Sequence, residues 1–236
     1  FLARDGFRGP TQILEAADGG FCRATSDAVD LSRAVDRLGA TFFSADVNIK
    51  PYACCASSHS AVDALLDLKR RHGFAAAQVA AVCVKTARGV QVQCGFDYRP
   101  AGAVRAQMSL QYIVAVALLE GAALLDQFAE AKLADPAVLD LARRVSIEVD
   151  PDIDRLYPER YANRVEIALL DGRRFETRVD FARGSGGHPL SFAEVAAKFR
   201  SLAAPAVSAE RADRIIDAVA SLDALKEIRR LARLLA

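Results

Sequence analysis

Asp171-Gly172 is the sequence feature that most constrains the fold. It stands between two segments interpreted as strands, residues 164–170 (RVEIALL) and residues 173–180 (RRFETRVD). An Asp-Gly pair accommodates the positive φ angles of the tight turn that joins antiparallel strands. The two segments are therefore predicted to be the neighbouring strands of a β-hairpin.

Further strands are predicted in the middle of the chain. Residues 79–86 (VAAVCVKT) and 145–149 (VSIEV) are short segments rich in β-branched side chains. In residues 90–94, apolar residues alternate with glutamines, which predicts a half-buried strand. Residues 41–49 (TFFSADVNI) are β-branched and aromatic, and they predict a strand or an extended segment.

Helical periodicity and end signals predict helices in much of the remaining chain. One helix is expected to begin after Ser57 or Ser58 and to run to about His72, with Gly73 after its end. The other predicted helices lie within residues 6–20 and at residues 27–38, 103–119, 122–132, 136–144, 192–202, 209–220 and 222–234.

This order of elements predicts an α+β fold, because helices open and close the chain and a mixed block fills its middle. The simplest interpretation is an α/β domain inserted between helical segments. Residues 1–45 and 186–236 are then parts of a helical domain, and residues 46–185 form the inserted α/β domain.

Composition excludes several classes of function. The net charge of the 236-residue chain is +1, which argues against a nucleic-acid-binding surface, since such a surface needs a concentrated excess of Lys and Arg. The five cysteines form no regular framework, and an odd number of them is typical of reduced thiols in the cytoplasm. We expect no membrane partner, because the most apolar stretch, residues 112–125, is too short to span a bilayer.

The N-terminus carries no pattern typical of a signal peptide. The first residue is a phenylalanine rather than a methionine. We therefore expect a chain that was processed, cut or taken from something longer.

Residues 50–64 (KPYACCASSHSAVDA) form the densest group of reactive side chains. His59 is expected in the first helical turn, where unpaired backbone N–H groups favour anions such as a carboxylate substrate. The positive end of the helix also lowers the pKa of a histidine and favours the neutral form that a general base needs. Cys55, His59 and Asp63 are four residues apart, so they share one helical face if the helix begins early enough.

Plainer interpretations of this segment stay open. From sequence alone, a histidine near a helix start such as His59 is more often a solvated or capping residue than a catalyst. Cys54 and Cys55 are more typical of small buried residues than of nucleophiles. A metal site built from Cys55, His59 and Asp63 has no support from a CxxC pair or an HExxH helix.

Two other motifs are weak. Asp150, Asp152 and Asp154 look like the start of a calcium loop, but Arg155 and Tyr161 stand where such a loop needs Gly and Glu. Residues 184–187 (GSGG) lack the Lys-Ser/Thr that follows a phosphate-binding loop, and we interpret them as a crossover between domains. We therefore expect no metal.

Five segments, in order, resemble the MmgE/PrpD family. Residues 50–64 are similar to the family pattern K-P-Y-x-x-C-x-x-x-H-x-x-x-D-A. The other segments are residues 6–21 (GFRGPTQILEAADGGF), 105–121 (RAQMSLQYIVAVALLEG), 157–175 (YPERYANRVEIALLDGRRF) and 187–199 (GHPLSFAEVAAKF). Ala16 and Met108 depart from the usual Gly and Phe of the family.

The resemblance implies a cofactor-free enzyme that acts on small di- and tricarboxylates. Family activities include 2-methylcitrate dehydration, cis-aconitate decarboxylation and iminodisuccinate epimerisation, all written as proton transfer next to a carboxylate. It also implies a helical domain with a smaller α/β lid domain, a site in the cleft between them, and a homodimer.

The resemblance also implies site residues. His59 matches the motif histidine that faces the cleft, and Tyr112 matches the tyrosine of the lid helix; both are predicted to be catalytic. Lys50, Cys55 and Ser109 are predicted to bind the substrate. The alternatives are a core tyrosine for Tyr112 and a solvated lysine for Lys50.

Family members carry a long N-terminal helical region before the point where this sequence begins, so the resemblance covers the C-terminal portion only. We expect a dehydratase or decarboxylase. The alternatives are an epimerase or isomerase of the same family, a truncated non-catalytic interaction domain and, more remotely, a Cys-His hydrolase.

Overall fold

The computed structural model describes residues 1–236, except for the side chains of residues 45 and 46. The chain divides into two compact units, Phe1–Val47 and Asn48–Ala236. The expected boundary between residues 45 and 46 falls on the two side chains that lie outside the described set. The division into residues 1–45, 46–185 and 186–236 therefore stays a prediction, as does the lid arrangement.

The second unit contains a four-stranded sheet with the order β2-β1-β3-β4 among the described residues. Its strands are β1 (Val79–Thr86), β2 (Val145–Val149), β3 (Asn163–Leu169) and β4 (Arg174–Val179). Strand β2 runs parallel to β1, whereas β3 is antiparallel to both β1 and β4. The predicted hairpin is confirmed, and Gly172 at its turn has a φ of +89°.

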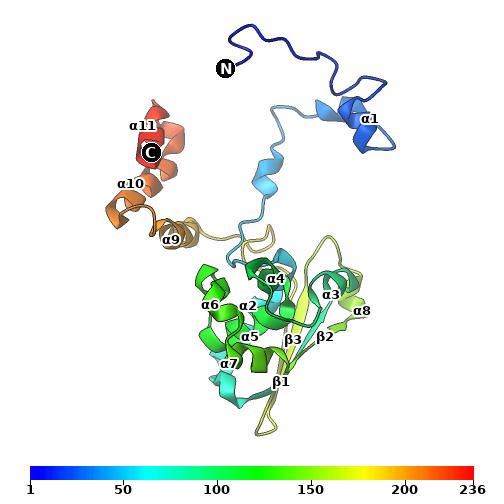
Figure 1. The fold of residues 1–236 in the computed structure, drawn as a ribbon, viewed down its shortest axis with the longest axis vertical. Coiled ribbons are helices and arrows are strands. Elements are labelled where there is room, and N and C mark those ends of the chain that lie inside the picture. The colour runs from blue at the N-terminus through cyan, green and yellow to red at the C-terminus, as the bar shows by residue number, and fades with distance from the viewer. The chain divides into compact units, whose positions relative to one another are not determined.

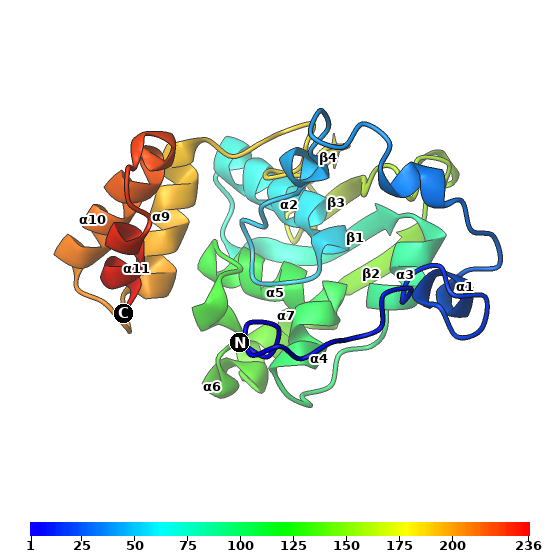
Figure 2. The same cartoon turned by 90° about the horizontal axis from the view of Figure 1, so that it is seen from above.

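Helices cover one face of this sheet. Helix α2 (His59–His72) packs on β3 and β4, and α5 (Leu110–Glu120) packs on β2 and on α7 (Pro136–Ala142). Figures 1 and 2 show α2 and α5 beside the strands in both views. The α+β fold class is thus confirmed.

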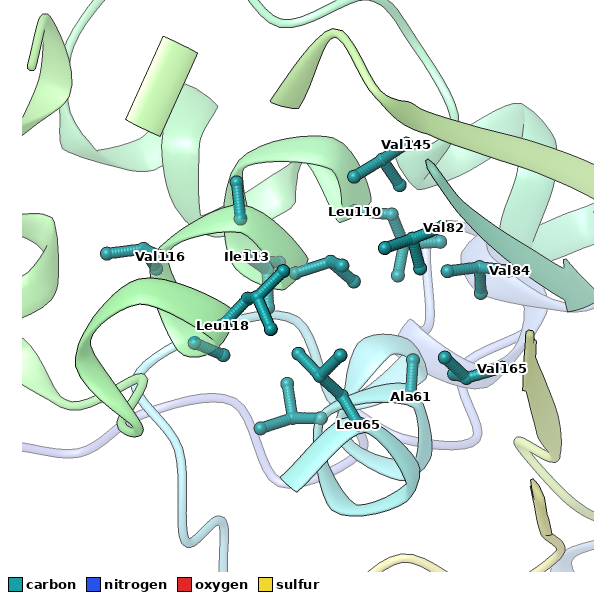
Figure 3. Close-up of a cluster of buried hydrophobic side chains, with 14 of the residues drawn as sticks. Ala61, Leu65, Val82, Val84, Leu110, Ile113, Val116, Leu118, Val145 and Val165 are labelled. Carbon is teal, nitrogen blue, oxygen red and sulfur yellow. The ribbon is translucent and has the colours of Figure 1, made fainter. Parts of the chain in front are cut away.

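The core lies between these helices and the strands. Figure 3 shows side chains from α2, α5, β1, β2 and β3 converging on one apolar cluster. Along β1, Val82 and Val84 are buried in this cluster, while Cys83 and Lys85 between them are only partly buried. Most residues of α5 are buried because this helix is apolar on nearly every side.

The predicted strand at residues 90–94 is wrong, because these residues belong to helix α3 (Arg88–Cys94). A helix places Val90 and Cys94, four residues apart, on the same face, and both are completely buried. Val92 between them is 79% exposed, whereas a strand would place all three on one face.

Two long predicted helices are each broken in the structure. Residues 103–119 form α4 (Ala103–Met108) and α5, separated at Ser109, whose Oγ accepts a hydrogen bond from the Tyr112 N–H at 3.4 Å. A side chain that caps a new helix also ends the previous one. Residues 122–132 form a 3-10 helix (Leu125–Phe128) and α6 (Glu130–Leu133) instead of one helix.

The first unit differs most from expectation. It contains α1 (Phe21–Thr25) and two 3-10 helices (Leu31–Ala34 and Phe43–Asp46). The helix predicted within residues 6–20 is not formed, the one at residues 27–38 shrinks to a single short turn, and residues 41–49 form no strand. Most of the unit's large apolar side chains are exposed, and helices of this length depend on packing for their stability.

Among the remaining helices, α9 (Phe192–Ala203) and α10 (Ala209–Ala220) follow the prediction closely. The helix predicted at residues 222–234 is instead a 3-10 helix (Leu222–Ala224) followed by α11 (Arg229–Leu235), and α8 (Pro151–Asp154) is a short helix that was not predicted. Ser191 and Glu194 form a capping box at the start of α9, and α10 packs on both α9 and α11. Within the described part of the chain, none of the helices is long and apolar enough to cross a bilayer.

We expect Leu65→Ala to lower the free energy of unfolding by about 2–5 kcal/mol, because Leu65 is completely buried between α2 and the core. Leu170→Ala is the matched control, since Leu170 is 70% exposed. The control should change stability by less than about 0.5 kcal/mol. Urea denaturation followed by circular dichroism measures both, and equal shifts in the two variants would contradict the assigned core.

Candidate active site

A cavity of about 370 Å³ lies at the start of helix α2. It is lined by three stretches of the second unit that are far apart in sequence. These are residues 48–50 with Ala56 and His59, residues 158–161 before β3, and residues 180–187 after β4. The cavity has the size of a site for a small molecule.

The glycine loop (residues 184–187) forms one wall of this cavity. Gly184 accepts a hydrogen bond from the Ile49 N–H at 2.9 Å, and Gly186 donates one to Asn48 Oδ1 at 3.1 Å. Gly184 has a φ of +81°, and a Cβ at this position would lie 1.9 Å from the Ile49 oxygen. Only glycine permits so close an approach of the two backbones.

His59 is the first residue of α2 and lines the cavity although it is only 3% exposed. Its Nε2 lies 3.3 Å from the carbonyl oxygen of Cys54, and the ring of Tyr52 packs against it edge-on at 5.2 Å. A carbonyl oxygen only accepts hydrogen bonds, so Nε2 of the neutral ring carries the hydrogen. Nδ1 then keeps the lone pair that can take a proton.

Burial lowers the pKa of the His59 imidazole to about 4, and the positive charges of Lys50 and Lys198 act in the same direction. The hydrogen bond with Cys54 and the negative charge of Asp63 oppose this change. The sequence led us to expect a lowered pKa from the helix end. The direction agrees, but the main cause is desolvation of the charged ring.

Asp63 connects the walls of the cavity. Its Oδ1 accepts a hydrogen bond from the Tyr52 hydroxyl at 2.5 Å, and its Oδ2 accepts one from the Arg183 backbone N–H at 2.8 Å. Burial, followed by this contact with Asp63, raises the pKa of the Tyr52 phenol. Asp63 therefore fixes both the segment before α2 and the chain leading into the glycine loop.

Cationic side chains line the cavity that His59 lines, or lie near His59 itself. Lys50, Arg160 and Arg183 line the cavity, and the ammonium group of Lys198 on α9 donates to the Lys50 carbonyl oxygen at 2.6 Å. The acidic lining residues are Glu159 and Asp180. Asp180 is paired with Arg178 and Arg183 with Glu194, each at 2.6 Å, so the described ion pairs leave Lys50 and Arg160 against Glu159. The surplus of positive charge favours an anionic ligand.

The structure does not bring Tyr112 and Ser109 to this cavity. The Tyr112 side chain is completely buried among Tyr98 and Phe128, and its hydroxyl donates to the Gln127 carbonyl oxygen at 2.7 Å. Ser109 is also completely buried. The catalytic role of Tyr112 and the binding role of Ser109 stay predictions, and their contacts fit the alternative of core residues.

Cys55 also lies outside the cavity lining. It precedes the 3-10 helix Ala56–Ser58, so it does not share a helical face with His59 and Asp63. Its Sγ lies 3.6 Å from Ser57 Oγ, and a hydrogen bond with Cys94 lowers the pKa of its thiol. The described contacts of Cys55 and His59 thus do not join the two as a nucleophile and its base.

Sequence reasoning missed Arg160, Phe181 and Arg183 as site residues. Arg160 lies in the segment 157–175 that already resembled a known family, and this was the available signal. Phe181 and Arg183 follow β4 and reach the site only because the hairpin returns the chain to the start of α2. The glycine loop, interpreted from sequence as a crossover, is also a wall of the cavity.

No cluster of three or more His, Cys, Asp or Glu side chains that suits a metal ion occurs among the residues described by the structure. Asp150, the first residue of the calcium-like segment, instead caps α8 by accepting the Asp152 N–H at 2.9 Å.

Comparison with known proteins gives the family. The model of the MmgE/PrpD C-terminal domain matches residues 52–224. A cis-aconitate decarboxylase of Aspergillus terreus is 30% identical over 99% of this chain and 51% of its own length. The cis-aconitate decarboxylases of Mus musculus and Homo sapiens are each 28% identical over 100% of this chain and 49% of their own lengths. The chain spans about half the length of these relatives. It belongs to the MmgE/PrpD family, as a match to that family's C-terminal domain.

Proposed function

We propose that the protein is a lyase that acts on a small di- or tricarboxylate, with His59 moving the proton at a carbon next to a carboxylate. In a dehydration, His59 takes that proton and the hydroxyl group leaves as water; in a decarboxylation, CO₂ leaves and the ring passes a proton from solvent to the carbanion that remains. The observation that carries the proposal is a buried histidine, kept neutral by its low pKa, whose Nδ1 has no hydrogen-bond partner among the described side chains and which lines a cavity with a surplus of positive charge. The names of the relatives make cis-aconitate the first substrate to test. The homodimer, the cofactor-free state and the cytoplasmic location expected above stay predictions.

The charges around His59 suit this chemistry. Removing a proton next to a carboxylate places negative charge on the substrate, and the cations of the cavity stabilise that charge. A bound polycarboxylate also places negative charge beside His59. It therefore raises the low pKa of the imidazole toward neutrality, where a general base works best.

We expect His59→Gln to lower kcat by about 10²- to 10⁴-fold, because the variant lacks the proton acceptor. The complete native polypeptide is incubated with cis-aconitate, 2-methylcitrate or citrate, and the unsaturated product is followed by absorbance. The matched control is His72→Gln, since His72 lies at the far end of α2, stacked on Phe175. Unchanged turnover of the His59 variant would remove His59 from the mechanism.

The pH dependence provides a second test. A base must be neutral to act, so kcat/KM should rise about tenfold per pH unit up to the low pKa of about 4 and stay level above it. The corresponding change in kcat should occur at a higher pH. The reason is that kcat reports the enzyme–substrate complex, in which the bound carboxylates raise the pKa of the His59 imidazole.

Circular dichroism at each pH checks that the protein stays folded during these measurements. A kcat/KM that falls as the pH rises through neutrality would show that His59 donates a proton instead. Deuterium entering the substrate carbon from D₂O without loss of water or CO₂ would indicate an isomerase rather than a lyase.

A further inference from the structure

Arg160 differs from the other arginines near the cavity. Its guanidinium lies 4.8 Å from the ring centroid of Phe181. Arg183 pairs with Glu194 at 2.6 Å, and Arg178 pairs with Asp180 at the same distance. Among the residues with described side chains, no carboxylate forms an ion pair with Arg160.

The position of the Phe181 ring depends on Gly187 in the glycine loop. A Cβ on Gly187 would lie 2.3 Å from Cδ1 of that ring, so any other residue would displace it. Phe181 therefore packs against the loop and offers a face to Arg160. A guanidinium stacked on a ring keeps its N–H groups at the edge, where they can bind a carboxylate in a bidentate manner.

Arg160 and Lys50 belong to different stretches of the cavity lining. Lys50 and Lys198 are close enough to lower the pKa of His59. Arg160 comes from residues 158–161, the stretch that precedes β3. A ligand with two or more carboxylates can therefore engage Lys50 with one and Arg160 with another.

We propose that Arg160 determines substrate specificity by binding, as a bidentate partner, the carboxylate remote from the carbon on which His59 acts. This inference rests on the proposed function and names the residue that binds the second, distal carboxylate of its substrate. The stacked and unpaired guanidinium carries it, and Phe181 and Gly187 hold the group in place.

The kinetic test compares Arg160→Gln and Arg160→Lys with Arg155→Gln in the complete native polypeptide. Arg155 is an exposed arginine of the preceding turn that pairs with Asp152 and does not line the cavity. For Arg160→Gln we expect the KM for cis-aconitate to rise about 10- to 100-fold, with kcat changed less than about threefold. Arg160→Lys should recover little, because an ammonium does not bind in a bidentate manner.

A binding test does not depend on turnover. In calorimetry, the affinity for tricarballylate should fall by the same 10- to 100-fold in Arg160→Gln. A loss of this size corresponds to one hydrogen bond with a charged group. The affinity of acetate, which has a single carboxylate and can be measured by its competition with tricarballylate, should be the same in both proteins. Urea midpoints that match the wild type show that the variants are folded.

The outcomes separate the two proposals. Tricarballylate binding that depends on Arg160, without any lyase activity, would leave this inference standing and overturn the proposed reaction. Lyase activity whose KM is unchanged in Arg160→Gln would overturn this inference and leave the reaction standing. A loss in kcat alone would also overturn it, because a residue that only binds a distal carboxylate acts on KM.

Discussion

Hydrogen bonds hold helix α2 at both ends, and they fix the position of the cavity that lies at its start. Before the helix, the Ala53 and Cys55 N–H groups donate to the carbonyl oxygens of Ala123 and Gln107. At the other end, Lys69 donates to the Leu118 carbonyl oxygen at 2.6 Å. The buried face of α2 packs on the sheet between these anchors, so the first residue of the helix has one position. That residue is His59.

Electrostatics then decides the state of His59. Burial and two nearby lysines disfavour the imidazolium, and the carboxylate of Asp63 is already engaged by Tyr52 and Arg183. The resting ring is therefore neutral. Negative charge brought by a ligand opposes the effect of the lysines, which couples the binding of an anion to the basicity of the histidine.

Much of the second unit follows from local sequence. Strand β1, the Asp171-Gly172 hairpin and helix α2 could be predicted because their periodicity, turn residues and end signals agree with their burial. The stretch at residues 90–94 could not, since five residues of alternating polarity suit a strand as well as one helical turn. The burial of both Val90 and Cys94 in the core favours the helix over the strand.

The site residues also fall into those that the sequence indicates and those that only the fold brings together. Sequence by itself determined that Lys50 lies nine positions before His59, at the approach to a helix start, because one motif, residues 50–64, contains both. Only the tertiary structure decided that Arg160, Phe181 and the glycine loop close the cavity around them. It also placed Tyr112 in the core, where α5 is enclosed on nearly every side. The physical reason is that local patterns fix secondary structure, whereas the return of the β3–β4 hairpin to α2 depends on contacts between residues more than a hundred positions apart.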